Sequence, residues 1–175
     1  MKINIFSIPI FLGNIDVKKI KIENQTYKKN WTSETLSSYK SPNISLDEKS
    51  TLYLLKIISK LIVPEVKNKF NINLLDIWTN KYSKNDYQEE HIHCGSDFSF
   101  IIYSKIKESK TVFVSDYKYP IETFNLLSLF PTEFNLSCRS NQIVVFPSFL
   151  KHRVDKNNFS GETISGNVKI TLKNE

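Results

Sequence analysis

The sequence is short of both glycine and cysteine, so it offers little basis for linkers or disulfides. Of its 175 residues, only four are glycine and two are cysteine. Few glycines leave little room for a flexible linker between domains. Two cysteines, Cys94 and Cys138, cannot build the disulfide framework of a small secreted domain. We therefore expect one globular domain over residues 1–175, in the reducing environment of a cytoplasm.

Arginine is also scarce, and the positive charge of the chain comes almost wholly from lysine. The net charge is +6, yet the only arginines are Arg139 and Arg153. Lysine is a strongly hydrated point charge that favours solubility. No run of basic residues with interleaved aromatics stands out, so we expect no nucleic-acid footprint. No apolar run is long enough to span a bilayer, and the start lacks a signal-peptide pattern. We therefore expect no membrane association.

The most informative scarcity is that of histidine. The three histidines are His91, His93 and His152. Residues i and i+2 of a strand point to the same face, so His91 and His93 can aim at a point that His152 reaches from a later strand. Neutral imidazoles suit iron, copper, zinc and nickel. The spacing predicts a metal site on a β scaffold, although most lone histidines in proteins have no ligand role.

Acidic residues beside the histidine pair leave the ligand set open. Asp86, Glu89 and Glu90 could supply a third ligand, or could accept a hydrogen bond from the ring N–H of a ligand. A solvated turn is the simpler interpretation of Glu89 and Glu90. Cys94 follows His93 directly and would face the opposite way on a strand, so we expect it to be structural.

One amphipathic helix is predicted in the first half of the chain. Ser45-Leu46-Asp47-Glu48 matches a capping box. Behind it, apolar residues recur at helical spacing: Leu52, Leu55, Ile58 and Ile62. We expect this helix to end near Val63, because Pro64 breaks or kinks it. Its apolar stripe predicts a face that packs on a sheet.

Most of the remaining chain has the pattern of short strands. The expected strands are Lys2–Leu12, Leu74–Tyr82, Tyr87–His93, Phe98–Ile106, Thr111–Val114, Gln142–Phe146 and Thr163–Leu172. In the fourth of these, Phe98, Phe100 and Ile102 fall on one face and Ser99, Ile101 and Tyr103 on the other. Residues 116–137 look irregular, and their length suggests a lid or rim over a site. The sequence predicts a mainly β sandwich or jelly roll with the N-terminal helix packed on its outside.

Taken in order, a set of short motifs resembles a known family. The motifs are Ile77-Trp78-Thr79-Asn80, Asp86-Tyr87-Gln88, His91-Ile92-His93, Phe98-Ser99-Phe100, Phe146-Pro147-Ser148, His152-Arg153-Val154 and Ile164-Ser165-Gly166-Asn167. Together they resemble the 2-oxoglutarate- and iron(II)-dependent oxygenases that are common in marine bacteria and their tailed phages. The resemblance covers nearly the whole chain, and the ordered set is more specific than any single piece.

The resemblance implies a double-stranded β-helix, or jelly roll, that holds one Fe(II). Such enzymes oxidise 2-oxoglutarate to succinate and CO₂ and hydroxylate a second substrate. Their usual ligands are two histidines and one carboxylate. Carried over, His91 and His152 would be iron ligands, and His93 falls where the wider superfamily has an aspartate. The resemblance also suggests the cytoplasm of a bacterium or of a phage-infected host.

One departure from the family pattern concerns the binding of 2-oxoglutarate. The family usually has an arginine at the start of the final strand, where it pairs with the far carboxylate of the cosubstrate. Here that region contains Gly161 and Glu162. Lys169 could serve as a point charge instead, and Lys151, Arg153 and Arg139 are other candidates. Tyr103 and Ser148 look like pocket residues that could hydrogen-bond the cosubstrate, or equally like core residues.

Three functions therefore remain open on the sequence alone. The first is a 2-oxoglutarate- and Fe(II)-dependent dioxygenase with a small-molecule cosubstrate and an unknown substrate. The second is a metal-binding jelly-roll module without turnover, which the missing arginine favours. The third is a three-histidine, cupin-like oxygenase that does not use 2-oxoglutarate. A homo-oligomer is possible in each case.

Overall fold

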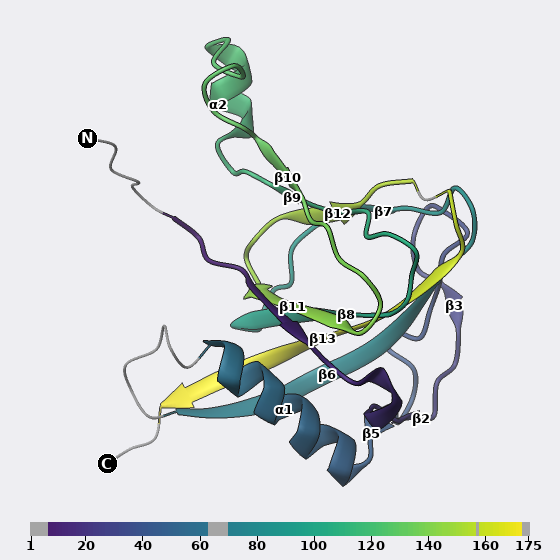
Figure 1. Ribbon diagram of the computed structural model, residues 1–175. Helices are drawn as coiled ribbons and strands as arrows, with labels where there is room; N and C mark the ends of the chain where they lie inside the picture. Colours follow the sequence, from purple (N-terminus) through teal and green to yellow (C-terminus); the bar gives the residue numbers. More distant parts are fainter. Residues whose placement is uncertain (1–6, 63–69, 157, 173–175) are drawn as a thin grey trace.

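Two antiparallel sheets face each other in the computed structural model, which describes residues 7–62, 70–156 and 158–172 (Figure 1). The larger sheet contains, in spatial order, β1 (Phe11–Asn14), β11 (Gln142–Pro147), β8 (Phe98–Lys105), β13 (Gly161–Leu172), β6 (Phe70–Tyr82), β4 (Leu36–Ser37) and β3 (Lys28–Lys29). The smaller sheet contains β10 (Glu133–Asn135), β9 (Thr111–Val114), β12 (His152–Val154) and β7 (Gln88–His91). This arrangement confirms the expected mainly β fold.

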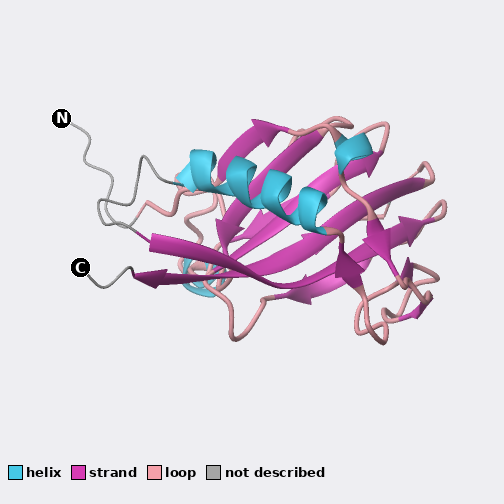
Figure 2. Cartoon of the chain, turned by 90° about the horizontal axis from the view of Figure 1, so that it is seen from below, coloured by secondary structure: helices cyan, strands magenta, loops and turns pink. Residues whose placement is uncertain are grey.

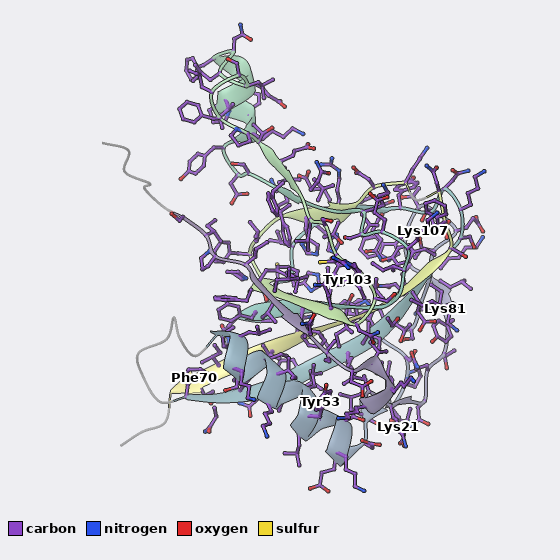
Figure 3. All side chains as sticks on the ribbon, viewed as in Figure 1. Lys21, Tyr53, Phe70, Lys81, Tyr103 and Lys107 are labelled. Atoms are coloured by element: carbon purple, nitrogen blue, oxygen red, sulfur yellow. The ribbon has the colours of Figure 1, made fainter. Side chains whose placement is uncertain are left out.

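Side-chain alternation along β8 separates two hydrophobic cores. Phe100 and Ile102 point to the outer face of the larger sheet, whereas Ile101 and Tyr103 point inward, toward the smaller sheet. Figure 3 shows Tyr103 between the two sheets. The two faces predicted from the sequence are confirmed. Only the inner face can contribute to a cavity between the sheets, because the outer one is covered by a helix.

That helix is α1 (Glu48–Ile62), which lies across the outer face of the larger sheet (Figure 2). Leu54, Ile58 and Ile62 are fully buried in the outer core. Burying an aliphatic side chain of this size contributes about 1.5–3 kcal/mol, so these three residues fix the helix to the sheet. The expected external helix is therefore confirmed. Pro64, the expected stop, lies outside the described residues.

Two details of the predicted helix are wrong. The N-terminal cap is Asp47, whose Oδ1 accepts a hydrogen bond from the Ser50 amide at 2.7 Å, because Ser45 belongs to the short strand β5 (Ser45–Leu46). Leu52 is 63% exposed. The buried stripe runs through Leu54 and Ile58, and a residue two positions before Leu54 lies on the far side of a helix with 3.6 residues per turn.

Smaller corrections apply to the N-terminal region. The first described strand is β1, and residues 2–6 of the expected strand lie outside the described residues. Residues 14–22 alternate acids, lysines and aliphatics, a pattern that suggests a short helix, but the only helix they contain is the short 3₁₀ turn η1 (Val17–Lys19). It is followed by β2 (Ile22–Glu23), which pairs with β5. These elements form a rim beside α1 and leave the interior between the sheets free.

Residues 115–132 form an arm that projects from the body of the molecule (Figure 1). The arm connects β9 to β10 and carries the short helix α2 (Lys118–Thr123). For residues 116–137, the sequence suggested an irregular segment that forms a lid or rim over a site. That expectation is wrong on both points, because the arm contains a helix and its residues do not line the cavity described below.

Gly166 allows β13 to lie close to its two neighbours in the larger sheet. It pairs with Ile77 of β6 and with Phe100 of β8. A Cβ atom at this position would lie 2.5 Å from the backbone oxygen of Asp76 and would overlap the Phe100 ring. No other residue type fits without a shift of the strands.

Among the described residues, no helix is long and apolar enough to cross a membrane.

Replacing Gly166 with alanine should destabilise the fold by about 1–3 kcal/mol, the usual cost of overpacking a core. Urea unfolding followed by circular dichroism measures this change. Gly13→Ala is the matched control, because its new Cβ would meet only the flexible side chain of Leu61. Equal unfolding free energies for the two variants would contradict this account of the close approach.

Candidate metal centre

Strand pairing brings two of the three histidines together. In the antiparallel pair of β7 and β12, His91 and His152 lie directly opposite each other. Side chains at such cross-strand positions lie on the same face of a sheet and are near neighbours. The centroids of the two rings are 4.3 Å apart. The fold itself therefore fixes this contact between residues far apart in sequence.

His93 lies just beyond the end of β7 and completes the group. Its backbone N–H donates to the backbone oxygen of Ser148 at 2.9 Å, which holds the chain beside the end of β11. Its ring centroid lies 5.3 Å from that of His91 and 5.2 Å from that of His152. One potential ligand atom from each histidine lies within 4.8 Å of those of the other two. The structure thus brings together all three residues predicted from the sequence.

Hydrogen bonds set the same tautomer on all three rings. The Nδ1 of His91 lies 2.7 Å from the backbone carbonyl oxygen of Glu89, and the Nδ1 of His152 lies 3.0 Å from the backbone carbonyl oxygen of Leu150. The Nδ1 of His93 lies 2.7 Å from Oδ1 of Asn167. These oxygens only accept hydrogen bonds, so each Nδ1 carries the proton. Each Nε2 is left with a free lone pair, which is the form that binds a metal.

Burial keeps the three rings neutral at physiological pH. It lowers the pKa of His91 and of His93 below the ordinary value, because the charged imidazolium would lose its hydration. The effect is largest at His152, where burial lowers the pKa to about 3. Three neutral imidazoles in contact, with their lone pairs unprotonated, fit a divalent transition-metal ion.

Acidic residues do not join this group in the described part of the chain. Asp86 is buried and accepts a hydrogen bond from the backbone N–H of Ser83, so it closes the turn before β7. Glu89 accepts a hydrogen bond from Thr32, and Glu90 forms an ion pair with a lysine. Cys94 is exposed and free. The geometry therefore favours His93 over a neighbouring carboxylate as the third ligand.

A buried polar network holds His93 from behind. Asn167 accepts hydrogen bonds from His93 and, at 2.7 Å, from Ser99. The hydroxyl oxygens of Ser99 and Ser148 lie 2.8 Å apart. The hydroxyl of Ser148 also accepts a hydrogen bond from the hydroxyl of Ser96 at 2.8 Å. Ser148 is 1% exposed and does not line the cavity. In this structure it supports the loop of His93 rather than facing the cavity.

A cavity between the sheets opens from the three histidines into the interior. Its other polar lining residues are Asn80, Tyr82, Gln88, Tyr103, Glu108, Ser109, Lys110, Thr111, Thr163 and Ser165. Tyr103, predicted as a pocket residue, is among them, and its hydroxyl donates to Oγ1 of Thr111 at 2.9 Å. The cavity volume is about 30 Å³, which holds one or two waters. A larger occupant would require side chains to move.

Several polar atoms that line this region are buried and have no partner. They are Nε1 of Trp31, Oδ1 of Asn80 and Nε2 of Gln88. Buried polar groups are almost always hydrogen-bonded, and exceptions call for an explanation such as a bound ligand or water. Two donors and one acceptor beside the histidines fit an occupant with polar oxygen atoms.

A second, open pocket reaches the histidines from the outside. Its volume is about 380 Å³, and its aromatic walls are Trp31, Tyr39 and Trp78. The rings of His91 and His93 line both this pocket and the inner cavity. The candidate metal centre therefore lies between the inner cavity and the open pocket. Trp31 and Trp78 are the only tryptophans of the chain, so intrinsic fluorescence reports on this site.

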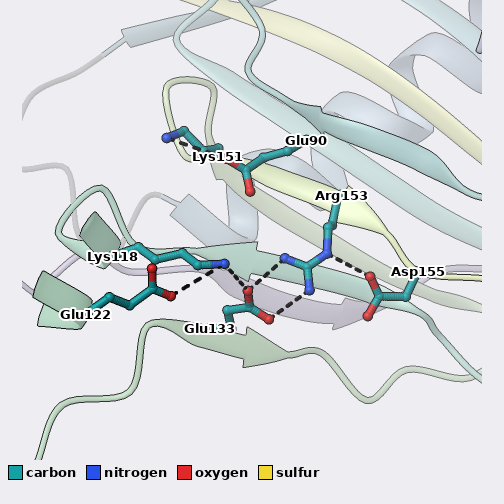
Figure 4. Close-up of polar contacts among 7 residues, drawn as sticks. All are labelled: Glu90, Lys118, Glu122, Glu133, Lys151, Arg153 and Asp155. Carbon is teal, nitrogen blue, oxygen red and sulfur yellow. Dashed lines mark hydrogen bonds and ion pairs between the residues drawn. The ribbon is translucent and has the colours of Figure 1, made fainter. Parts of the chain in front are cut away.

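The structure brings two of the expected cationic residues to other places. Lys169 is half exposed, and its Nζ donates to Oδ1 of Asp97 at 3.0 Å. Arg153 makes a two-pronged contact with Glu133, at 3.0 and 2.7 Å, and a further one with Asp155 (Figure 4). Hydrogen bonds from Arg153 and Lys118 lower the pKa of Glu133 to about 2. Neither Lys169 nor Arg153 lines the cavity of the histidines.

Lys110 is the cation that reasoning from the sequence missed. It lines the cavity, and its Nζ lies 2.9 Å from Oε2 of Glu108. Thr163, the inward-facing residue near the start of β13, lines the same cavity and is 7% exposed. The sequence offered one weak signal, namely that Lys110 directly precedes a β-branched strand. Which strand that segment would pair with was not readable from the sequence.

The comparisons with known proteins agree with this geometry. Residues 76–167 match the model of a family described as "Putative 2OG-Fe(II) oxygenase", and this match covers more than half of the chain. It includes all three histidines. No curated protein matches the chain at a significant level.

Solved structures of low sequence identity share the fold. A 2OG-Fe(II) oxygenase family oxidoreductase from Burkholderia pseudomallei has a TM-score of 0.52 and 9% identity, over 93% of this chain and 73% of that one. A Pseudomonas putida prolyl-4-hydroxylase has a TM-score of 0.52 and 9% identity, over 83% and 76%. HygX from Streptomyces hygroscopicus, solved with nickel, 2-oxoglutarate and hygromycin B, has a TM-score of 0.51 and 14% identity, over 84% and 74%. These likenesses confirm the expected jelly roll.

Replacing Asn167 with alanine should weaken metal binding roughly 10- to 100-fold, the usual effect of removing a group that orients a ligand. Without Oδ1 of Asn167, the His93 ring loses the acceptor that fixes its tautomer. Titration calorimetry with Mn(II) or Zn(II) measures the affinity. Asn73→Ala, at an exposed position of β6, is the control and should bind metal like the wild type. Unchanged affinity in the Asn167 variant would contradict this role.

Proposed function

Because the chain belongs to the 2OG-Fe(II) oxygenase family, we propose that His91, His93 and His152 bind its iron. The family is one of oxidoreductases that couple oxidation of 2-oxoglutarate to succinate and CO₂ with hydroxylation of a second substrate. The bound Fe(II) supplies the site for O₂ activation. The single observation that carries this proposal is the convergence of three neutral imidazoles whose Nδ1 atoms all have acceptors.

The proposed ligand set has a consequence for charge. Three neutral histidines leave the full double positive charge of the ion without compensation from the protein, whereas the usual set includes one carboxylate. An anionic cosubstrate is then attracted more strongly to the centre, since the attraction acts in a buried site of low effective dielectric. This would favour a dicarboxylate such as 2-oxoglutarate over a neutral ligand.

We propose that Lys110 binds the far carboxylate of the cosubstrate, the role that the missing arginine usually has. Lys110 is supported by its position in the lining of the cavity that the histidines share. Tyr103 and Thr163 lie on the same lining and could add hydroxyl contacts. Freeing Lys110 requires its ion pair with Glu108 to open, which agrees with a cavity too small for 2-oxoglutarate in the present conformation.

The open pocket with the aromatic walls is the proposed entry for the second substrate. It is supported by its direct access to His91 and His93 and by its volume of about 380 Å³. Its walls hold tryptophan and tyrosine rings together with the amide of Asn30 and the carboxylate of Asp76. The identity of the substrate stays open.

A three-histidine oxygenase that does not use 2-oxoglutarate is the second candidate. The absence of an arginine at the start of β13 and the small cavity favour it. The cytoplasmic location, the marine-bacterial or phage origin and the oligomeric state stay predictions.

The function is tested by assaying succinate formation from 2-oxoglutarate with the Fe(II)-loaded protein. Uncoupled turnover proceeds slowly without the second substrate, so a low but iron-dependent rate is expected. His152→Ala should abolish both metal binding and turnover. Metal binding without succinate, combined with O₂ uptake independent of 2-oxoglutarate, would instead support the second candidate. Turnover retained by the His152 variant would exclude that residue as a ligand.

Lys110→Met should raise the Kd for 2-oxoglutarate roughly 10- to 100-fold, because a hydrogen bond to a charged group contributes about 1.5–3 kcal/mol. Quenching of the Trp31 and Trp78 fluorescence in Mn(II)-loaded protein measures this Kd without turnover. Lys169→Met is the matched control, since Lys169 pairs with Asp97 outside the cavity. A larger loss of 2-oxoglutarate affinity in the Lys169 variant than in the Lys110 variant would show that Lys169 binds the far carboxylate. That result would overturn the assignment of Lys110.

A further inference from the structure

The arm of residues 115–132 is the largest unexplained feature of the surface. Six large apolar side chains on it are more than half exposed: Tyr117, Tyr119, Phe124, Leu127, Leu129 and Phe130. Scattered single apolar residues are normal on a surface, but a contiguous patch of this kind marks an interaction site. The arm also extends away from the body of the molecule (Figure 1), and no other element of the described residues covers these six side chains.

The base of the arm is firmly built. The backbone N–H of Ser115 donates to the backbone oxygen of Thr132 at 2.8 Å, which joins the two ends of the arm. Lys118 contacts Glu133 at 2.7 Å, and Glu133 is held in turn by Arg153 (Figure 4). Such a network of ion pairs orients the arm in one direction. A projecting apolar element held in place in this way is suited to insertion into a partner.

An apolar groove lies beside the base of the same arm. Its volume is about 450 Å³, and its apolar walls include Ile8, Ile10, Phe113, Phe134 and Leu150. The root of the arm, with Asp116 and Tyr117, forms one side of the groove. It has the size of a pocket that encloses a small ligand, so it can take several side chains. The chain thus carries both a protruding apolar element and an apolar hollow next to it.

We propose that two copies of this chain form a twofold dimer in which each arm docks into the groove of the other. A surface that carries an element and its receptor side by side is self-complementary, and a twofold axis satisfies both contacts at once. Fully burying an aromatic side chain removes about 150–250 Å² from solvent, and the six arm side chains are half to three-quarters exposed, so they offer roughly 600 Å² per copy. The apolar walls of the groove add to this area, which therefore approaches the roughly 800 Å² per partner of a standard stable interface.

Charge favours this occupant over a lipid surface. Segments that lie in a membrane interface are usually rich in lysine and arginine, which contact anionic headgroups. The arm carries a single cation, Lys118, and two acids, Asp116 and Glu122. Lys118 is engaged by Glu133 and Glu122. The arm itself carries a net charge of −1, which is opposite in sign to the net charge of +6 of the chain that it would meet.

The dimer couples to the metal centre through Lys151, which precedes His152. Its Nζ lies 3.6 Å from Oε1 of Glu90, beside His91, and 3.7 Å from Oδ1 of Asp116 at the root of the arm. Docking of a second copy would hold the arm root and the two ligand-bearing strands in one arrangement.

Sedimentation equilibrium of the full chain over a range of micromolar concentrations tests the proposal. The expected result is a species with twice the mass of the chain. Leu129→Asp, in the arm, should raise the dimer dissociation constant at least 100-fold. Leu52→Asp is the matched control, because Leu52 is 63% exposed on α1, outside the arm and groove. Circular dichroism checks that both variants remain folded.

A mixing experiment tests the docking mode. Phe134→Asp alters the groove, and Leu129→Asp alters the arm, so each variant alone should be monomeric. Their mixture retains one intact arm and one intact groove, and it should form heterodimers that are weaker than the wild-type dimer. A monomer for the wild type at all concentrations, or no heterodimer in the mixture, would overturn the proposal. Binding of the wild-type arm to phosphatidylserine vesicles with loss of dimers would overturn it in favour of a lipid surface.

Discussion

The antiparallel pairing of β7 with β12 is the interaction on which the rest of the structure depends. It sets His91 opposite His152, and the same strands carry the loop that brings His93 to both. The two strands are short, so backbone hydrogen bonds alone would hold them weakly. They are held because β12 also pairs with β9 and because the inner core fills the space beneath them. The contact between His91 and His152 is thus a property of the sheet, and hydrogen bonds to Ser148 and Asn167 hold His93 against it.

The larger sheet supports this centre from the opposite side. The Oδ1 of Asn167, on β13, accepts a hydrogen bond from the Nδ1–H of His93, and Asn167 is placed there by the close approach that Gly166 allows. The outer core under α1 fixes that sheet in turn. A chain of contacts therefore runs from the helix through β13 to a ring nitrogen. Because each contact fixes an orientation, burial far from the histidines contributes to the order of the site.

The sequence predicted the mainly β class, the external helix, the two faces of β8 and the histidines that meet. These features depend on local periodicity and on residue chemistry, which are visible along the chain. It did not predict that α1 is capped by Asp47, that Leu52 is exposed or that residues 115–132 form an arm. It also missed Lys110, while its candidate Lys169 pairs with Asp97. Such features depend on strand pairing between distant segments, which periodicity does not reveal.

X-ray absorption spectroscopy of the protein loaded with one equivalent of Fe(II) under anaerobic conditions tests the central claim most directly. The account predicts three imidazole nitrogens around each ion, at metal–nitrogen distances near those of other histidine sites, with light oxygen ligands in the remaining positions. A spectrum with two or fewer imidazoles, or with ions bound at several weak sites, would contradict it.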